Sequence, residues 1–237
     1  MALDQYYLLG RSGLRVSRLA LGTMNFYTAG QSETILGGLI AEANVRDRVV
    51  LTTKFTNSVD PGDPNAGGNG RKHMIRALED SLRRLGTDYV DLFLLHTWDR
   101  LTPVEEVMRT LDDLVRAGKI RYAGLSDVPA WYAAQAQTYA DAHGLTPVIN
   151  LQLPYSLVER AIEVEHVDMG QRLGLGITAW SPLGGGFLSG KYRFDQGLSG
   201  DGRLSIPGAS GLDLTDRHWP WHPSRSTACS PPAIRAS

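Results

Sequence analysis

Polar side chains that could do chemistry stand at the ends of several apolar runs in this chain. Lys54 follows VVLTT, His96 follows DLFLL, Ser126 and Asp127 follow IRYAGL, and Gln152 ends VINLQ. A lysine supplies a positive charge, a histidine can donate or accept a proton, and the other groups can hydrogen-bond a polar ligand. If these runs are parallel strands, their ends gather at one edge of the sheet, where β/α enzymes place their active sites.

Each of these residues also has a structural explanation of its own. A lysine at a strand end can extend its ammonium into solvent. A histidine that follows apolar residues is more often a hydrogen-bonded core residue than a catalyst. Because Lys54 and His96 stand at corresponding ends of consecutive runs, a shared site is the favoured interpretation.

Hydrophobic periodicity predicts alternating strands and helices. Strands are expected at 17–26, 49–55, 90–96, 120–125, 148–152 and 176–180, and helices at 32–43, 71–85, 102–118, 129–143 and 161–173. Ser32 is expected to cap the first helix, and residues 102–105 resemble a capping box with proline in the first turn. Strands separated by helices pair in parallel through right-handed crossovers.

Three further features complete the expected architecture. Short apolar runs around Arg11, Ser12 and Gly13 predict an N-terminal β-hairpin. Residues 57–70 are rich in Gly, Pro and Asn and are longer than a plain connection, so we expect a surface loop near the site. The pattern gives about six strand and helix units, whereas a closed barrel has eight. We therefore predict an α/β fold of the (β/α)8 TIM-barrel type that is incomplete.

Composition narrows the class of protein. The 237 residues are 42% hydrophobic and 21% charged, which suits one barrel domain at 1–192, followed by a Gly/Ser/Pro-rich and disordered tail at 193–237. A net charge of -1 gives no reason to expect nucleic acid or an anionic membrane as a partner. A single cysteine and the lack of an apolar run of membrane-spanning length lead us to expect a cytoplasmic protein.

Several longer stretches resemble the aldo-keto reductase family. They are LGRSGLRVSRLALGTMNF, SETILG, VVLTTKF, ALEDSLRRLGTDYVDLFLLH, TLDDLVRAGKIRYAGLSD, INLQLPYSL and AWSPLGGGFLSGKY. They occur in the family's order and cover most of the chain to Tyr192. The resemblance implies a (β/α)8 barrel that reduces aldehydes and ketones with NADPH and without a metal ion.

The resemblance also implies a catalytic set of tyrosine, lysine, histidine and aspartate. Lys54 and His96 match the lysine and the histidine, and Tyr27, in YTAGQSE, matches the tyrosine that donates a proton. The alternative is that Tyr27 is only an aromatic residue at a junction. The aspartate has no match, because residues 27–48 have room for one helix where the family has two helices and a strand. We therefore expect an internal deletion.

Cofactor contacts follow from the same resemblance. Gly22, Thr23 and Met24 would end the first strand beside the nicotinamide, and Trp180 would stack on its ring. Ser126, Asp127 and Gln152 would bond the carboxamide, although the family has asparagine where this chain has Asp127, and a carboxylate can only accept hydrogen bonds. The pyrophosphate would lie on the run formed by Ser181, Pro182, Leu183, Gly184, Gly185 and Gly186. The family's clamp for the 2′-phosphate has no match after Tyr192.

Three functions remain open at this point. The first is carbonyl reduction with NADP(H), at a rate greatly lowered by the missing aspartate. The second is an inactive barrel that binds a nucleotide or a partner protein. The third is a poorly folded remnant that self-associates through exposed sheet edges.

Overall fold

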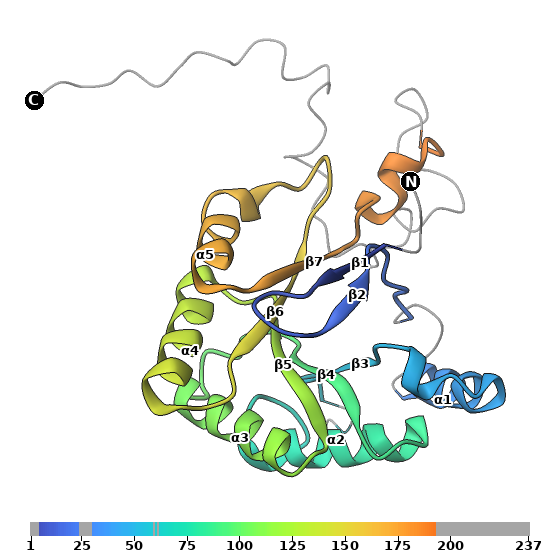
Figure 1. Cartoon of the computed structure of the whole chain (residues 1–237), viewed down its shortest axis with the longest axis vertical. Helices are drawn as coiled ribbons and strands as arrows, with labels where there is room; N and C mark the ends of the chain where they lie inside the picture. The colour runs from blue at the N-terminus through green and yellow to red at the C-terminus, as the bar shows by residue number, and fades with distance from the viewer. Residues whose placement is uncertain (1–4, 24–29, 59, 61, 193–237) are drawn as a thin grey trace, which may run out of the picture. The chain divides into compact units, whose positions relative to one another are not determined.

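Five strands form one all-parallel sheet in the computed structural model, which describes residues 5–23, 30–58, 60 and 62–192. The strands are β3 (Thr52–Phe55), β4 (Val90–Leu95), β5 (Ile120–Ser126), β6 (Val148–Pro154) and β7 (Gly176–Trp180), paired in sequence order. Each is joined to the next through a helix (Figure 1). Alternating β/α units with parallel pairing confirm the prediction of an incomplete barrel.

Four helices cover one side of this sheet (Figure 1). They are α2 (Arg71–Leu85), α3 (Val104–Arg116), α4 (Ala130–His143) and α5 (His166–Leu173). Buried residues recur every three or four positions, such as Met74, Leu78, Leu82 and Leu85 of α2. These apolar stripes pack on the sheet.

The predicted hairpin is present at the N-terminal ends of the strands. β1 (Tyr6–Leu8) pairs antiparallel with β2 (Arg15–Ser17). The turn between them packs closely, because a side chain on Gly10 would lie 2.3 Å from the Ile149 carbonyl oxygen. Leu9 belongs to one buried cluster with Leu92 and Ile149. The hairpin therefore covers the end of the sheet opposite the polar strand ends.

The strand predicted at 17–26 is wrong for its described part. Residues 18–23 have no regular structure, and Leu19 and Leu21 are 70% and 81% exposed. A strand needs a neighbour for its backbone donors and acceptors, and among the described strands none pairs with this segment. The sheet thus has five strands in the described chain where the sequence predicted six.

Helix boundaries differ from the prediction at four places, one of which is α4, which begins at Ala130 with Pro129 as its N-cap. The first helix, α1, spans Gln31–Ala43 with Gly30 at its N-cap, and the Ser32 hydroxyl donates to the Thr23 carbonyl oxygen (2.9 Å) instead of capping. Pro103 precedes α3 without a capping box, because the Thr102 hydroxyl donates to Asp99 (2.7 Å). The helix predicted at 161–173 is divided into a 3-10 turn, η2 (Ala161–Glu163), and α5.

Helix α1 packs on α2 and β3. The Glu33 carboxylate accepts from the Thr53 hydroxyl of β3 (2.5 Å) and pairs with Arg84 of α2 (2.6 Å). Gly37 is buried, and a Cβ added there would lie 2.4 Å from the Leu85 carbonyl oxygen. Only glycine allows the two helices to approach so closely.

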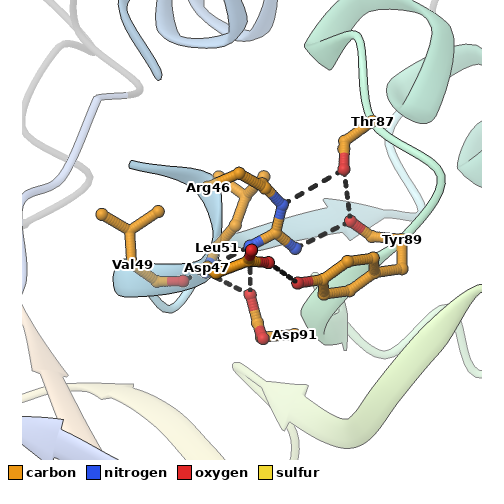
Figure 2. A network of polar contacts seen from close by, with 7 residues as sticks. All are labelled: Arg46, Asp47, Val49, Leu51, Thr87, Tyr89 and Asp91. Atoms are coloured by element: carbon orange, nitrogen blue, oxygen red, sulfur yellow. Dashed lines mark hydrogen bonds and ion pairs between the residues drawn. The ribbon is translucent and has the colours of Figure 1, made fainter. Parts of the chain in front are cut away.

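A polar network, drawn in Figure 2, secures β3. Among the described strands, β3 pairs with β4 alone. Arg46, in the 3-10 turn η1 (Arg46–Arg48), donates to Asp91 (3.0 Å), to the Tyr89 carbonyl oxygen (2.9 Å) and to the Thr87 hydroxyl (3.1 Å). Asp91 also accepts from the Leu51 amide (2.9 Å). These bonds tie the chain that enters β3 to the chain that enters β4.

The chain divides into two compact units, one of residues 1–154 and 161–180, the other of residues 155–160 and 181–237. The first holds the sheet. The described part of the second contains the 3-10 segment η3 (Gly184–Ser189). In the described ranges no helix is long and apolar enough to cross a membrane. The tail predicted at 193–237 lies outside the described residues.

Candidate active site

The polar strand ends meet along the carboxyl edge of the sheet. Lys54 of β3 is in register with Leu94, two residues before His96, and Ser126 of β5 is in register with Gln152 of β6. Leu95 of β4, directly before His96, pairs with Leu125 of β5, directly before Ser126. Parallel pairing therefore brings Lys54, His96, Ser126, Asp127 and Gln152 to one edge.

Lys54 and Asp127 form the charged part of this edge. Burial lowers the pKa of Lys54, and the Asp127 carboxylate opposes that effect. Burial also raises the pKa of Asp127, against the bond from the Trp180 indole and the charge of Lys54. No ion pair joins Lys54 and Asp127 at salt-bridge distance, so they act on each other through space. Asp127 thus favours the charged form of a lysine that burial would neutralise.

Asp127 is held in a defined position. The Trp180 indole nitrogen donates to its Oδ1 (2.9 Å), and its backbone amide donates to the Gln152 carbonyl oxygen (3.3 Å). Its φ of 47° lies in the left-handed region, which aspartate and asparagine tolerate better than most residues. The Ser126 hydroxyl is close enough to lower the pKa of Asp127, although no hydrogen bond of normal geometry joins the two side chains.

His96 is half-buried and neutral at physiological pH. Burial, reinforced by the positive charge of Lys54, lowers its pKa to about 4. Its Nδ1 lies 3.2 Å from the amide nitrogen of Asn57. Its backbone amide donates to the Thr56 hydroxyl (3.1 Å), which in turn donates to the Asn69 side chain (2.6 Å). The imidazole is therefore held from the loop that follows β3.

Sequence reasoning missed Asn57, Thr56 and Asn69. The loop at 57–70 was expected near the site, but none of its residues was singled out. A usable signal was present, since two hydrogen-bonding side chains, Thr56 and Asn57, directly follow the strand that carries Lys54.

The carboxyl edge has a group suited to a polar ligand. The Ser126 hydroxyl is buried and has no hydrogen-bond partner in the described part of the chain. A buried hydroxyl without a partner is unfavourable unless a ligand supplies one. Gln152, in register with Ser126, is half-buried. A carboxamide, which donates and accepts hydrogen bonds, fits this pair.

The glycine run of the second unit forms a tight turn. Gly184, Gly185 and Gly186 all have positive φ, between 56° and 99°. Their amides already donate within the turn, to the Ser181 carbonyl oxygen, the Ser181 hydroxyl and the Leu183 carbonyl oxygen. The glycines provide the backbone freedom that a phosphate-binding turn needs, but these three amides have partners.

Of the remaining predicted site residues, the structure describes Gly22 and Thr23 but not Met24 and Tyr27. Tyr27 and Met24 lie outside the described residues. Gly22 and Thr23 are described, but they do not end a strand, because the strand predicted at 17–26 is absent up to Thr23. Within the described chain, no group of three or more His, Cys, Asp or Glu side chains could hold a metal ion.

Comparisons with known proteins agree with this architecture. A family model described as "Aldo/keto reductase family" matches residues 18–210. An uncharacterized oxidoreductase of Bacillus subtilis is 37% identical over 79% of this chain and 69% of its own length. An aryl-alcohol dehydrogenase of Pestalotiopsis microspora is 37% identical over 82% of this chain and 50% of its own.

A norsolorinic acid reductase of Aspergillus flavus is also similar, at 37% identity over 86% of this chain and 51% of its own length. The chain therefore spans about half to two thirds of the length of these relatives.

Proposed function

The chain belongs to the aldo/keto reductase family, and from this premise we propose that it reduces the carbonyl group of a small aldehyde or ketone with NADPH. Family members are generally NAD(P)H-dependent oxidoreductases. The observation that carries the proposal is the grouping of Lys54, neutral His96 and the unpartnered Ser126 hydroxyl along one sheet edge of the described chain. Each of the three has a distinct task there.

The nicotinamide end of the cofactor would be held by Ser126 and Gln152, with Trp180 beside the ring. When bound, the cofactor supplies a hydride for the carbonyl carbon. Asp127 would accept from the carboxamide through Oδ2, because Trp180 already occupies Oδ1. The run from Ser181 to Gly186 is our candidate for contact with the pyrophosphate, since its glycines allow close backbone approach.

Proton transfer would be the task of Tyr27, with Lys54 and His96 in support. The Lys54 ammonium stabilises a phenolate, which brings the pKa of a tyrosine closer to neutrality. The neutral His96 ring would donate a hydrogen bond to the carbonyl oxygen and orient it. The proton from Tyr27 then completes the alcohol.

Asp127 supplies part of what the missing aspartate would give. Its carboxylate raises the pKa of Lys54 and so helps to keep the ammonium charged. It does not form an ion pair with Lys54 at salt-bridge distance, so it restrains the position of the lysine less. We therefore propose that turnover is slow rather than absent.

The relatives suggest where a substrate search should begin. Two of them are named for aryl alcohols and for norsolorinic acid, which favours aromatic carbonyl compounds as the first test set. We propose that residues 1–192 form the functional barrel domain, and that exposed sheet edges allow copies of it to associate.

The test is oxidation of NADPH by purified full-length protein with aromatic aldehydes and ketones, followed by the loss of cofactor absorbance. We expect slow, enzyme-dependent oxidation that Lys54→Met abolishes. Arg83→Met, which changes an exposed basic residue of α2, is the control and should keep the wild-type rate. Cofactor binding without turnover would instead support an inactive nucleotide-binding barrel. If the protein showed no cofactor binding and no turnover, the proposal would be overturned.

A further inference from the structure

The side chain of Asn57 contacts His96 at Nδ1 and, in the described chain, leaves the other ring nitrogen, Nε2, available to a ligand. The Asn57 amide nitrogen lies 3.2 Å from Nδ1 of the imidazole. With its pKa lowered to about 4, His96 carries a single ring proton near neutral pH. That proton can sit on Nδ1 or on Nε2, and only the nitrogen that holds it can donate a hydrogen bond.

Asn57 reaches His96 because the chain turns sharply at Thr56. Thr56 has a φ of 95°, a strained conformation that is rare for a β-branched residue. Such strain persists only where the surroundings hold it. Here the Thr56 hydroxyl bonds the His96 amide and Asn69, and the Asn69 amide nitrogen donates to the Thr97 carbonyl oxygen (3.0 Å). Both Thr56 and Asn69 are buried.

These contacts make a rigid link between the end of β3 and the end of β4. The isolated bridge between Thr56 and Gly68 closes the loop at its base. The Asn69 backbone amide is fixed as well, by a bond to the Asp99 carboxylate (2.8 Å). Asn57 is thus presented to the imidazole from a fixed backbone, although its own side chain is exposed.

We infer that Asn57 is a positioning residue that sets the tautomer of His96, with the proton on Nε2. In this orientation the side-chain amide nitrogen of Asn57 donates to Nδ1, so Nδ1 accepts and carries no hydrogen. In the described chain no hydrogen bond occupies Nε2, which leaves this N–H available to a ligand. The catalytic consequence, a hydrogen bond from Nε2 to the substrate carbonyl oxygen, rests on the proposed function, whereas the tautomer itself does not.

The charged groups around His96 agree with this assignment. Lys54, from the neighbouring strand, disfavours a second proton on the ring. Asp127 acts on Lys54, and no carboxylate lies at salt-bridge distance from His96 in the described chain. A carboxylate beside Nδ1 would pull the proton to that nitrogen, so an amide donor at this position favours the opposite tautomer.

The tautomer can be measured without any activity. In full-length protein labelled with 15N-histidine, protonated and unprotonated ring nitrogens give well-separated resonances, and His96→Gln identifies the His96 signals among those of the six histidines. We expect Nε2 protonated and Nδ1 unprotonated in the wild type. A proton on Nδ1 in the wild type would overturn the inference.

Asn57→Asp replaces the donor with an acceptor of nearly the same shape. We expect it to move the ring proton to Nδ1 and to raise the pKa of His96. Asn65→Asp is the matched control, because it adds the same charge to an exposed position of the same loop and should leave the His96 resonances unchanged. His96 signals that do not respond to Asn57→Asp would contradict the assigned role.

Kinetics separate this inference from the proposed function. If the chain reduces carbonyls, Asn57→Asp should lower kcat roughly 100-fold, as for the loss of one aligned donor, without weakening NADPH binding. Its activity should recover as the pH falls and the imidazolium regains a proton on Nε2. If no variant turns over but the tautomer shifts as expected, the inference stands and the proposed reaction fails.

Discussion

At the scale of the residue, burial and one lysine charge keep His96 neutral. Its pKa falls from 6.5 to about 4 in the folded chain. Between these two values the unfolded chain binds a proton at this position and the folded chain does not. The contribution of His96 to the free energy of unfolding therefore decreases as the pH falls from 6.5 toward 4.

We predict that His96→Gln reduces this acid destabilisation. Urea unfolding of the wild type and the variant at pH 7 and pH 5 gives the comparison. The difference in the free energy of unfolding between the two pH values should be smaller in the variant, because the variant lacks the His96 imidazole. His73 and Asp127 also have shifted pKa values, but they are present in both proteins and do not affect the comparison. An equal gap would contradict the burial of His96.

Asp127 gives a second prediction at this scale. Its charge raises the pKa of Lys54, so Asp127→Asn should make Lys54 titrate at a lower pH. NMR of selectively labelled lysine side chains can follow that titration. Asp168→Asn removes the same charge from an exposed pair with Arg172 on α5 and should leave Lys54 unchanged. A Lys54 titration unaffected by Asp127→Asn would refute the coupling.

At the scale of the element, α1 is held by one close contact. Gly37→Ala should destabilise the protein, because its Cβ would lie 2.4 Å from backbone oxygen of Leu85, and relief of an overpacked contact typically costs about 1–3 kcal/mol. Gly38→Ala is the matched control, since nothing lies within 4 Å of its Cβ. There alanine should stabilise the helix by up to about 1 kcal/mol. Urea unfolding of both variants checks the pair, and equal effects would contradict the packing.

Sequence patterns predicted the elements whose residues carry a strong period. β4, β5 and β6 are apolar along most of their length and buried, so they were found with nearly correct ends. Residues 18–23 belong to an apolar segment as well, but a strand also needs a partner, and pairing is a property of the whole sheet. The sequence predicted Ser32 as the helix N-cap for a similar reason, because its contact with a distant residue could not be foreseen. Its hydroxyl in fact donates to the Thr23 carbonyl oxygen.

The candidate site was predictable only in part for a related reason. Parallel pairing places strand ends together, so Lys54, His96, Ser126 and Gln152 could be grouped from sequence. Asn57 could not, because its contact with His96 depends on the positive φ of Thr56. The bond between Trp180 and Asp127 likewise joins residues far apart in the chain.

At the scale of the whole molecule, the described sheet has two edge strands, β3 and β7. A closed barrel has none. Exposed apolar side chains of the described chain include Val50, two residues before β3, and Leu39 of α1, which is 57% exposed. These features favour contact between copies of the chain.

We therefore predict concentration-dependent self-association. Sedimentation of the 237-residue chain should give an average mass that rises above 25.9 kDa with concentration. Val50→Lys, which places a charge beside the edge strand, should shift the protein toward the monomer. A monomer at all concentrations would mean that the edges are covered, and the proposal of self-association would then be abandoned.

The central claim is that the carboxyl edge of this sheet holds a nicotinamide cofactor, and titration of the full-length protein with NADPH tests it most directly. Tryptophan fluorescence, to which Trp180 contributes, should be quenched to saturation. Ser126→Ala should bind roughly fivefold more weakly because one hydrogen bond is lost, while its stability should not fall, since that hydroxyl has no partner in the described chain. An absence of saturable quenching, or equal affinity in Ser126→Ala, would contradict the site described here.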